Sequence, residues 1–215
     1  MRLLEVTGFL ATMALARPAT PHDLAARRGY HHGNLREALL EAARHLVAER
    51  GPQGFSLSEA ARRAGVSPSA PYRHFKDREE VLAELGRRGF VLFGQRLQAA
   101  TAGADSPTEA LPRMGPAYLA FAREEPGYYA AMFAFQPPGE DADQRRQGPL
   151  RSLSQAIAGV LPAGGAEPQL VALQVWALSH GVAMLERAGM PAPDSGAPPA
   201  EQVLDSGVEA LVKRR

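Results

Sequence analysis

The chain of 215 residues contains no cysteine and only one tryptophan. The absence of cysteine excludes disulfides, thiolate metal sites and thiol catalysis, and it fits the reducing cytoplasm, where we expect this protein to work. The sequence also has no glycine-rich phosphate loop after a strand and no array of carboxylates and histidines at useful spacing. An enzyme therefore has little support, and we expect no cofactor and no metal site.

Long hydrophobic runs are absent apart from the first sixteen residues, MRLLEVTGFLATMALA. This run ends in an A-x-A pattern, as a secretory signal does, but Glu5 interrupts it and its basic flank is a single residue, Arg2. It is also too short to span a bilayer. We expect residues 1–32 to be an N-terminal extension, with export as the alternative, and we expect no membrane partner.

Charge of one sign does not dominate, because the net charge is only +1, but it is unevenly distributed. Residues 27–98 contain 13 Lys/Arg against 8 Asp/Glu, whereas residues 99–215 contain 9 against 13. A basic N-terminal third favours an anion-binding module joined to something else. Scattered surface charge is an equally good explanation of this count alone.

No stretch alternates between apolar and polar residues as β-strands do, whereas helical spacing recurs along the chain. Asn34 is a plausible N-cap for a helix that Gly51-Pro52 ends. Ser56 and Glu59 have the spacing of a capping box for a short helix that Gly65 ends. Further helices are predicted after Asp77 and after the loop 101–107. The sequence thus predicts an all-α fold of about nine helices.

The C-terminal half continues this pattern. Tyr128 to Phe135 is predicted to begin a short aromatic helix, and Pro137 to Gln147 is predicted to be a polar loop. The segment 169–188 has apolar residues on both sides, which places such a helix deep in a bundle or between two subunits. An amphipathic helix closes the chain at about residues 200–213.

Residues 56–75 have the order of a helix-turn-helix, with Gly65 at the turn and Ser67 as the predicted cap of the second helix. Pro68 would then stand at N1, where a missing N–H is harmless. Pro71 is harder to place, because its N–H is required there and Ala70 before it is biased away from the helical region. We expect a loose or 3₁₀-like first turn, with regular helix only from about Pro71.

The run from His31 to Leu82 resembles the DNA-binding domain of tetracycline-repressor (TetR) type regulators over roughly residues 33–93. The matching pieces are Glu49-Arg50-Gly51, Phe55-Ser56-Leu57, Ala64-Gly65-Val66-Ser67 and Tyr72-Arg73-His74-Phe75. The chain departs from the family at Ala60, usually a larger aliphatic, and at Arg78, usually lysine. The resemblance implies that residues 94–215 form a helical effector-binding and dimerisation domain.

Phosphate contacts are expected from Ser56 and, as the resemblance implies, from Tyr72, His74, Lys76 and Arg78. Base contacts are expected from Ser67, Pro68, Ser69, Ala70 and Arg73; most of these are small, so apolar contacts to thymine methyls should predominate. Phe75 is expected to be core, and Tyr72 has core packing as its alternative. His31, His32 and Arg36 are candidates for further phosphate contacts.

The segments PGYYAAMF (126–133) and WALSHG (176–181) resemble the TetR subgroup whose C-terminal domain is named for a Trp-His-Gly motif. Trp176 and His180 are four residues apart on one helix face. Aromatic residues and methionines around them are candidates to line a mostly apolar effector pocket, although packing as bundle core is the better expectation for any one of them. The full set is Tyr118, Phe121, Tyr128, Tyr129, Met132, Phe133, Trp176, His180 and Met184.

The function implied is a DNA-binding transcriptional regulator, most often a repressor in this family. It would bind a palindromic double-stranded operator as a homodimer formed by helices 169–188 and 200–213, and an unknown small-molecule effector would release it. The alternatives are a DNA-architectural protein without a ligand and a helical enzyme that uses His180 as a base. The sequence does not identify the operator, the effector or the direction of regulation.

Overall fold

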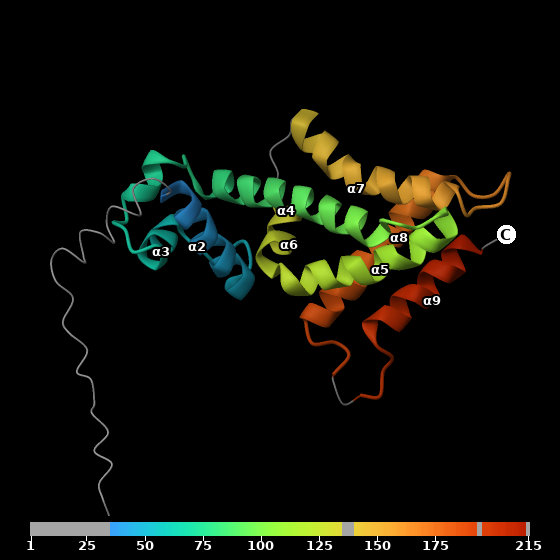
Figure 1. Ribbon diagram of the computed structural model, residues 1–215. Coiled ribbons are helices and arrows are strands. Elements are labelled where there is room, and N and C mark those ends of the chain that lie inside the picture. Colours follow the sequence, from blue (N-terminus) through green and yellow to red (C-terminus); the bar gives the residue numbers. More distant parts are fainter. Residues whose placement is uncertain (1–34, 135–139, 193–194, 214–215) are drawn as a thin grey trace, which may run out of the picture. The chain divides into compact units, whose positions relative to one another are not determined.

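The structure is a computed structural model that describes residues 35–134, 140–192 and 195–213, with the side chains of residues 140–146 also outside the description (Figure 1). Every regular element in these residues is helical. The α-helices are α2 (Leu35–Arg50), α3 (Leu57–Arg63), α4 (Arg78–Thr101), α5 (Pro107–Glu124), α6 (Pro126–Met132), α7 (Glu140–Ala158), α8 (Pro168–Arg187) and α9 (Ala200–Val212), and one 3₁₀ helix, η1, spans Ala70–Arg73. The predicted all-α fold is confirmed.

The predicted helix ends agree with the local chemistry. Ser56 and Glu59 form a reciprocal capping box, with Glu59 N–H donating to Ser56 Oγ (3.2 Å) and Ser56 N–H donating to Glu59 Oε2 (3.0 Å). Asp77 caps α4 by accepting the N–H of Glu80 at 2.8 Å. Gly51 and Gly65 have φ of 76° and 72°, the left-handed conformation that a glycine adopts without steric cost. The predicted cap Asn34, the extension 1–32 and the histidines His31 and His32 lie outside the described residues.

Two segments differ from the prediction. The polar segment predicted as a loop from Pro137 to Gln147 is helical from Glu140 onward, because α7 begins there and contains Pro149 within its length. The aromatic helix begins earlier than predicted, with Pro126 in its first turn, and ends at Met132 rather than Phe135. A proline at the first helical position needs no N–H partner, which explains why Pro126 starts a helix instead of only ending the previous one.

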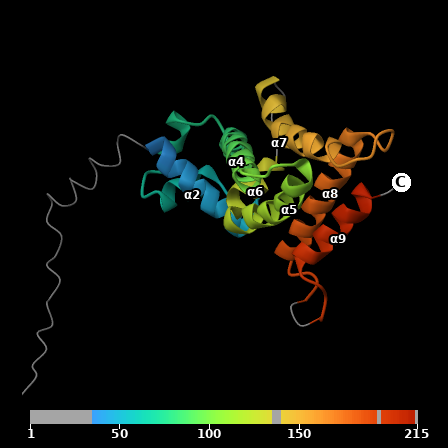
Figure 2. The ribbon, with the colours of Figure 1, turned by 45° about the vertical axis from the view of Figure 1, so that its right-hand side comes forward.

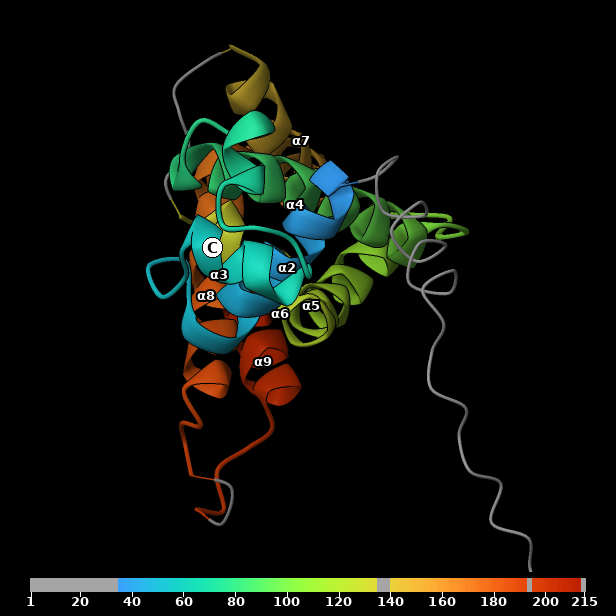
Figure 3. The ribbon, with the colours of Figure 1, turned by 90° about the vertical axis from the view of Figure 1, so that its left-hand side faces the viewer.

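The C-terminal helices pack around one buried core. Phe93, Tyr118 and Phe121 lie at its centre, with T-shaped or tilted ring pairs whose centroids are 5.2 Å apart. Helices α8 and α9 run side by side at one side of this core, as Figures 1, 2 and 3 agree. They approach closely at Gly207, where an added Cβ would lie 2.5 Å from Leu178 Cδ2 and the leucine side chain would have to shift.

Helix α4 belongs to two packed regions at once. Near its start, Val81, Leu82 and Leu85 are buried outside the C-terminal core, at the end of α4 that lies beside α2 (Figure 1). Further along, Phe90, Phe93 and Leu97 are part of the C-terminal core. The boundary predicted between residues 93 and 94 therefore falls within this one helix, whose 24 residues span about 36 Å at 1.5 Å per residue.

Candidate DNA-reading and effector sites

The segment that carries the second helix of the predicted helix-turn-helix is a single 3₁₀ turn. Pro68 and Ser69 form a turn before η1, the N-cap of η1 is Ser69 rather than the predicted Ser67, and no side chain caps it. Ser67 and Ser69 instead place their Oγ atoms 3.3 Å apart. The expected 3₁₀ character is confirmed, but the regular helix predicted to follow from Pro71 does not form, and the turn ends at Arg73.

Two buried residues hold this turn against the protein. Pro71 is buried in η1, and Phe75 is only 2% exposed, which confirms its predicted place in the core. The guanidinium carbon of Arg36 lies 5.1 Å from the centroid of the Phe75 ring, a cation–π distance. With its inner side fixed in this way, the turn presents its other side chains outward.

Most of the predicted DNA-contact residues, on the turn and beside it, are exposed. Tyr72 is 60% exposed, so it is not core, and the side chains of Arg73, His74 and Lys76 are exposed as well. Ser56, Ser67, Pro68 and Ser69 are also exposed, whereas Ala70 and Arg78 are half-buried.

Some of the cationic side chains on and around the exposed turn form no ion pair with a described residue. Arg73 and Lys76 form no ion pair with any described residue, and neither does Arg62 at the end of α3, which the sequence reasoning did not single out. Arg78 is held locally: it donates to the Gln53 carbonyl oxygen (3.3 Å) and to Gln53 Oε1 (2.9 Å), and pairs with Glu79. Unpaired cations beside an exposed turn are what phosphate contacts require.

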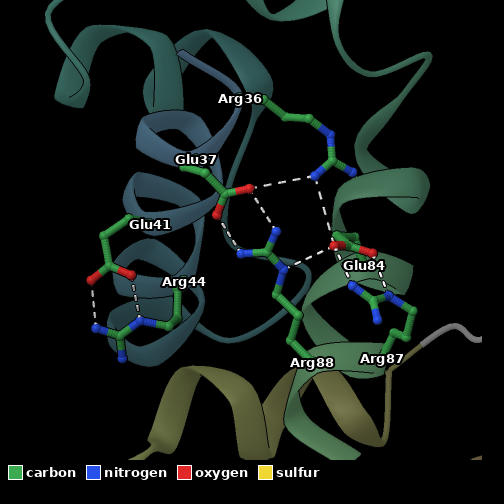
Figure 4. Close-up of polar contacts among 7 residues, drawn as sticks. All are labelled: Arg36, Glu37, Glu41, Arg44, Glu84, Arg87 and Arg88. Atoms are coloured by element: carbon green, nitrogen blue, oxygen red, sulfur yellow. Dashed lines mark hydrogen bonds and ion pairs between the residues drawn. The ribbon is translucent and has the colours of Figure 1, made fainter. Parts of the chain in front are cut away.

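A network of ion pairs joins α2 to α4, as Figure 4 shows. Arg88 donates to Glu37 Oε1 on α2 at 2.7 Å and to Glu84 Oε1 at 2.8 Å, and Arg87 also binds Glu84. These arginines lower the pKa of Glu84 to about 2, the largest contribution coming from the hydrogen bond with Arg87. Both carboxylates therefore remain ionised at neutral pH, and the network keeps α2 fixed to α4.

Helix α6 lies between α2 and α4 and approaches both closely. A Cβ on Gly127 of α6 would lie 2.3 Å from the carbonyl oxygen of Arg44 on α2, and a Cβ on Gly89 of α4 would lie 2.7 Å from Met132 Cγ on α6. The Arg44 guanidinium also lies over the ring of Tyr128, 5.4 Å from its centroid. Glycine is thus required at position 127, where an added Cβ would meet backbone, whereas at position 89 the nearest atoms belong to the Met132 side chain.

On its other side α6 is hydrogen-bonded to α8 through a buried cluster. The Tyr129 hydroxyl lies 2.8 Å from His180 Nδ1 and 3.3 Å from the Tyr118 hydroxyl. Burial raises the pKa of both tyrosines and lowers the pKa of His180, so all three groups are neutral at neutral pH. His180 is therefore a half-buried hydrogen-bond partner at the edge of the core, with the Phe133 ring centroid 4.2 Å from its own.

A mostly apolar cavity in the described part of the chain lies beside this cluster. It has a volume of about 450 Å³, and its walls come from α4, α5, α7, α8 and α9. Its inner wall is aromatic, with Trp176 in T-shaped contact with Phe93 (5.8 Å between centroids) and with Tyr118 (6.1 Å). A second cavity of about 520 Å³ adjoins it and shares Leu97, Met114 and Pro149 as its wall.

Only two of the nine predicted pocket residues, Tyr118 and Trp176, line the 450 Å³ cavity. Phe121, Tyr129 and Met132 are buried in the core; Tyr128 and His180 are half-buried; Phe133 and Met184 are exposed by 41% and 47%. The sequence reasoning missed the lining from α9, where Asp205, Val208, Glu209 and Val212 follow one another at helical spacing. A mixed acidic and apolar face on the last helix was the signal that could have found them.

Among the described residues, no helix is long and apolar enough to cross a membrane, and no group of three or more His, Asp or Glu side chains is placed to hold a metal ion.

Comparison with known proteins identifies the family. Residues 39–85 match the model of the bacterial regulatory proteins of the tetR family, and residues 111–211 match the model of a tetracyclin repressor-like C-terminal domain. The chain belongs to the TetR family. The subgroup named for the Trp-His-Gly motif stays a prediction.

Individual relatives agree with this assignment. The chain is 33% identical over 105 residues to the uncharacterized HTH-type transcriptional regulator YobS of Bacillus subtilis, an alignment that covers 46% of this chain and 51% of YobS. The matched part of the chain thus spans about half of the length, or less, of the curated relatives that it matches. A solved protein of unknown function from Rhodococcus sp. RHA1 is 28% identical, with a TM-score of 0.70 over 85% of this chain and 96% of that one.

The same fold occurs in AibR, solved in complex with isovaleryl coenzyme A and operator DNA. That structure is 22% identical, with a TM-score of 0.64 over 82% of this chain and 97% of AibR. At this identity the likeness concerns the fold alone.

Proposed function

We propose that this protein is a transcriptional regulator that binds a palindromic operator as a homodimer and is released by a small molecule held in the 450 Å³ cavity. The observation that carries the proposal is that one helix, α4, reaches from the exposed 3₁₀ turn to the cavity. Arg78, in its first turn, is anchored beside the exposed 3₁₀ turn, and Phe93 and Leu97 of the same helix line the cavity. A ligand that shifts these residues would move the helix to which the DNA-reading part is fixed.

DNA contact is proposed for the exposed side of the turn. Tyr72, His74, Lys76, Arg78 and Ser56 would hold phosphates, and Ser67, Pro68, Ser69, Ala70 and Arg73 would face base edges. Since a single 3₁₀ turn offers fewer side chains than a long helix, Arg73 is the one residue of this set that can make a bidentate contact to guanine. We expect it to carry much of the sequence preference.

Dimer formation is proposed through α8 and α9. Leu173 and Met184 on α8 are 49% and 47% exposed, and they share one face with Ala177 and Gly181. A Cβ on Gly181 would meet no atom within 4 Å, so this face is open and allows a second helix to approach closely. An exposed apolar stripe interrupted by small residues fits a second copy of the same surface.

Coupling between the two sites is proposed to run through α6. Tyr118 lines the cavity and contacts Tyr129, which belongs to α6, and Gly127 of α6 rests on the backbone of Arg44 in α2. A ligand that displaces Tyr118 would press on α6, and α6 cannot move toward α2 without a clash. The two recognition turns of the dimer would then lose the separation of about 34–36 Å that successive major grooves require.

The test is fluorescence anisotropy of labelled DNA from the protein's own upstream intergenic region, with excess random duplex as competitor. We expect saturable binding that survives the competitor and weakens about tenfold or more in Arg73→Ala. Arg113→Ala on α5 removes the same charge outside the DNA-reading surface and is the matched control. Binding that the random duplex abolishes, or equal losses in the two variants, would leave only non-specific electrostatic attraction and contradict the proposal.

A further inference from the structure

The charges around the 450 Å³ cavity restrict the kind of molecule it can hold. Asp205 and Glu209 of α9 both line it, and they lie four residues apart on one helix face. The single cation among the described lining residues is Lys213, and its Nζ is paired with Glu209. Asp205 forms no ion pair with any described residue, so its charge is available to a ligand.

The other walls are mostly aliphatic, with a proline turn and three aromatic rings among them. Pro112 lines the cavity together with Thr108, and because proline has no N–H, it cannot donate to the Thr108 carbonyl oxygen as residue i+4 of a helix normally does. Phe93, Tyr118 and Trp176 supply ring faces and edges at the inner end. Ring faces attract cations through their quadrupole, and this attraction strengthens where water is excluded.

We infer that the effector is a hydrophobic cation, with an apolar body against the aromatic wall and a positive charge toward Asp205 and Glu209. This inference rests on the proposed function, whose ligand it characterises. A volume of about 450 Å³ is within the range of about 300–1,000 Å³ that is usual for drug-sized ligands. A polyanion such as an acyl-coenzyme A would bring its phosphates to carboxylates, and the described lining offers it no unpaired cation.

The dimer face does not compete with this site. On α9 the cavity side is marked by Asp205, Val208 and Val212, whereas the 42% exposed Val203 lies about 160° around the helix from Asp205 at about 100° per residue. A second copy packed on the Val203 side would leave the carboxylates at the cavity. The same helix can therefore serve both roles.

The experiment uses two probes of matched shape and opposite charge, tetraphenylphosphonium and tetraphenylborate. Trp176 is the only tryptophan of the chain and lies in the cavity wall, so quenching of its fluorescence reports occupancy directly. We expect saturable quenching by the phosphonium, at a dissociation constant about tenfold below that of the borate. The preference should decrease as salt is added, because the carboxylates are near the surface.

Variants test whether the preference for the phosphonium over the borate comes from the carboxylates of α9. Asp205→Asn should weaken phosphonium binding about threefold to tenfold and narrow the difference between the two ions, as loss of one nearby charge requires. Glu124→Gln, an equal change of charge at an exposed position of α5 that does not line the cavity, should leave both affinities unchanged. Thermal unfolding of each variant verifies that it is folded.

Three results would overturn the inference: tighter binding of the borate, no saturable quenching by either ion, or tighter binding of isovaleryl coenzyme A than of the phosphonium. The DNA titration without ligand, described above, is independent of these measurements. Specific DNA binding together with any of the three results would leave the regulator proposal standing and remove only the charge assignment. Charge-selective binding without specific DNA binding would instead remove the regulator proposal.

Discussion

Substitution of Gly127 by alanine tests the close contact between α6 and α2. The Cβ atom would lie 2.3 Å from the Arg44 carbonyl oxygen and 3.0 Å from its carbonyl carbon, both backbone atoms that no rotamer change can remove. An ordinary contact at this position begins near 3.4 Å. The N-terminus of α6 and the backbone of α2 must therefore separate by roughly 1 Å, and the neighbouring Arg44–Glu125 pair must stretch with them.

The magnitude follows from two opposing terms. Alanine in place of a helical glycine is favourable by about 0.5–1 kcal/mol, because the unfolded chain loses freedom. Overpacking of a rigid contact costs about 1–3 kcal/mol. Since the clash here involves backbone, the upper part of that range applies, and we expect Gly127→Ala to lower the free energy of unfolding by about 1–2 kcal/mol.

Gly94→Ala is the matched control. Gly94 lies within α4, and a Cβ there would approach only Pro149 Cγ, at 4.0 Å, so the propensity gain should appear undiminished as a stabilisation of about 0.5–1 kcal/mol. Both variants are compared with the unchanged protein by urea unfolding at one fixed protein concentration, because the proposed dimer would make the midpoint depend on concentration. Equal or higher stability of Gly127→Ala would refute the argument that α6 rests directly on α2.

Three further predictions concern other parts of the structure. Phe75→Ala should lower the free energy of unfolding by about 3–5 kcal/mol, whereas Tyr72→Ala, at a position 60% exposed, should change it by less than about 0.5 kcal/mol; similar losses in urea unfolding would contradict the placement of these rings. Because the folded pKa of Glu84 is about 2, below its ordinary value of 4.5, its contribution to stability is present above about pH 4.5 and is lost as the pH falls toward about 2. Glu84→Gln should flatten that part of the stability profile, and an unchanged slope in acid unfolding would show that the network with Arg87 and Arg88 does not hold the carboxylate. Leu173→Glu on α8 should convert a dimer to a monomer in light scattering, whereas Val91→Glu, on α4, should not.

The sequence predicted the fold well where local chemistry decides it. The capping box at Ser56 and Glu59, the cap Asp77 and the left-handed glycines act within a few residues of chain, so their effect can be read without knowing the packing. The start of α7 at Glu140 could not be predicted in this way. Its first turns are polar and contain no apolar stripe, and polarity alone does not distinguish an exposed helix from a loop.

The recognition segment was predicted only in part, for a physical reason. Pro68 and Pro71 predict an irregular first turn. Whether a regular helix follows that turn depends on tertiary contacts with residues outside the segment. Here Pro71 and Phe75 are both drawn into the core, which ends the turn at Arg73. Those tertiary contacts are not encoded in the four residues of the turn itself.

The cavity was the least predictable feature. Aromatic residues near a histidine indicated the right region, and Tyr118 and Trp176 do line the cavity, but Tyr129 and Phe121 serve as core beside it. A cavity is the space that packing leaves, so its walls depend on how five helices meet and not on any one stretch of sequence. The α9 carboxylates were missed because a charged position on an amphipathic helix ordinarily faces water.

Helix α4 contributes buried residues to two packed regions, and this affects how the protein folds and where it can be cut into fragments. Its first half buries Val81, Leu82 and Leu85, and its second half supplies Phe90, Phe93 and Leu97 to the core of the C-terminal helices. A fragment that stops at Phe93 would keep the DNA-reading residues and yet expose two buried rings along one side of its longest helix. Amide hydrogen exchange should therefore find one level of protection along the whole of α4, the mark of a single cooperative unit rather than of two modules that open separately.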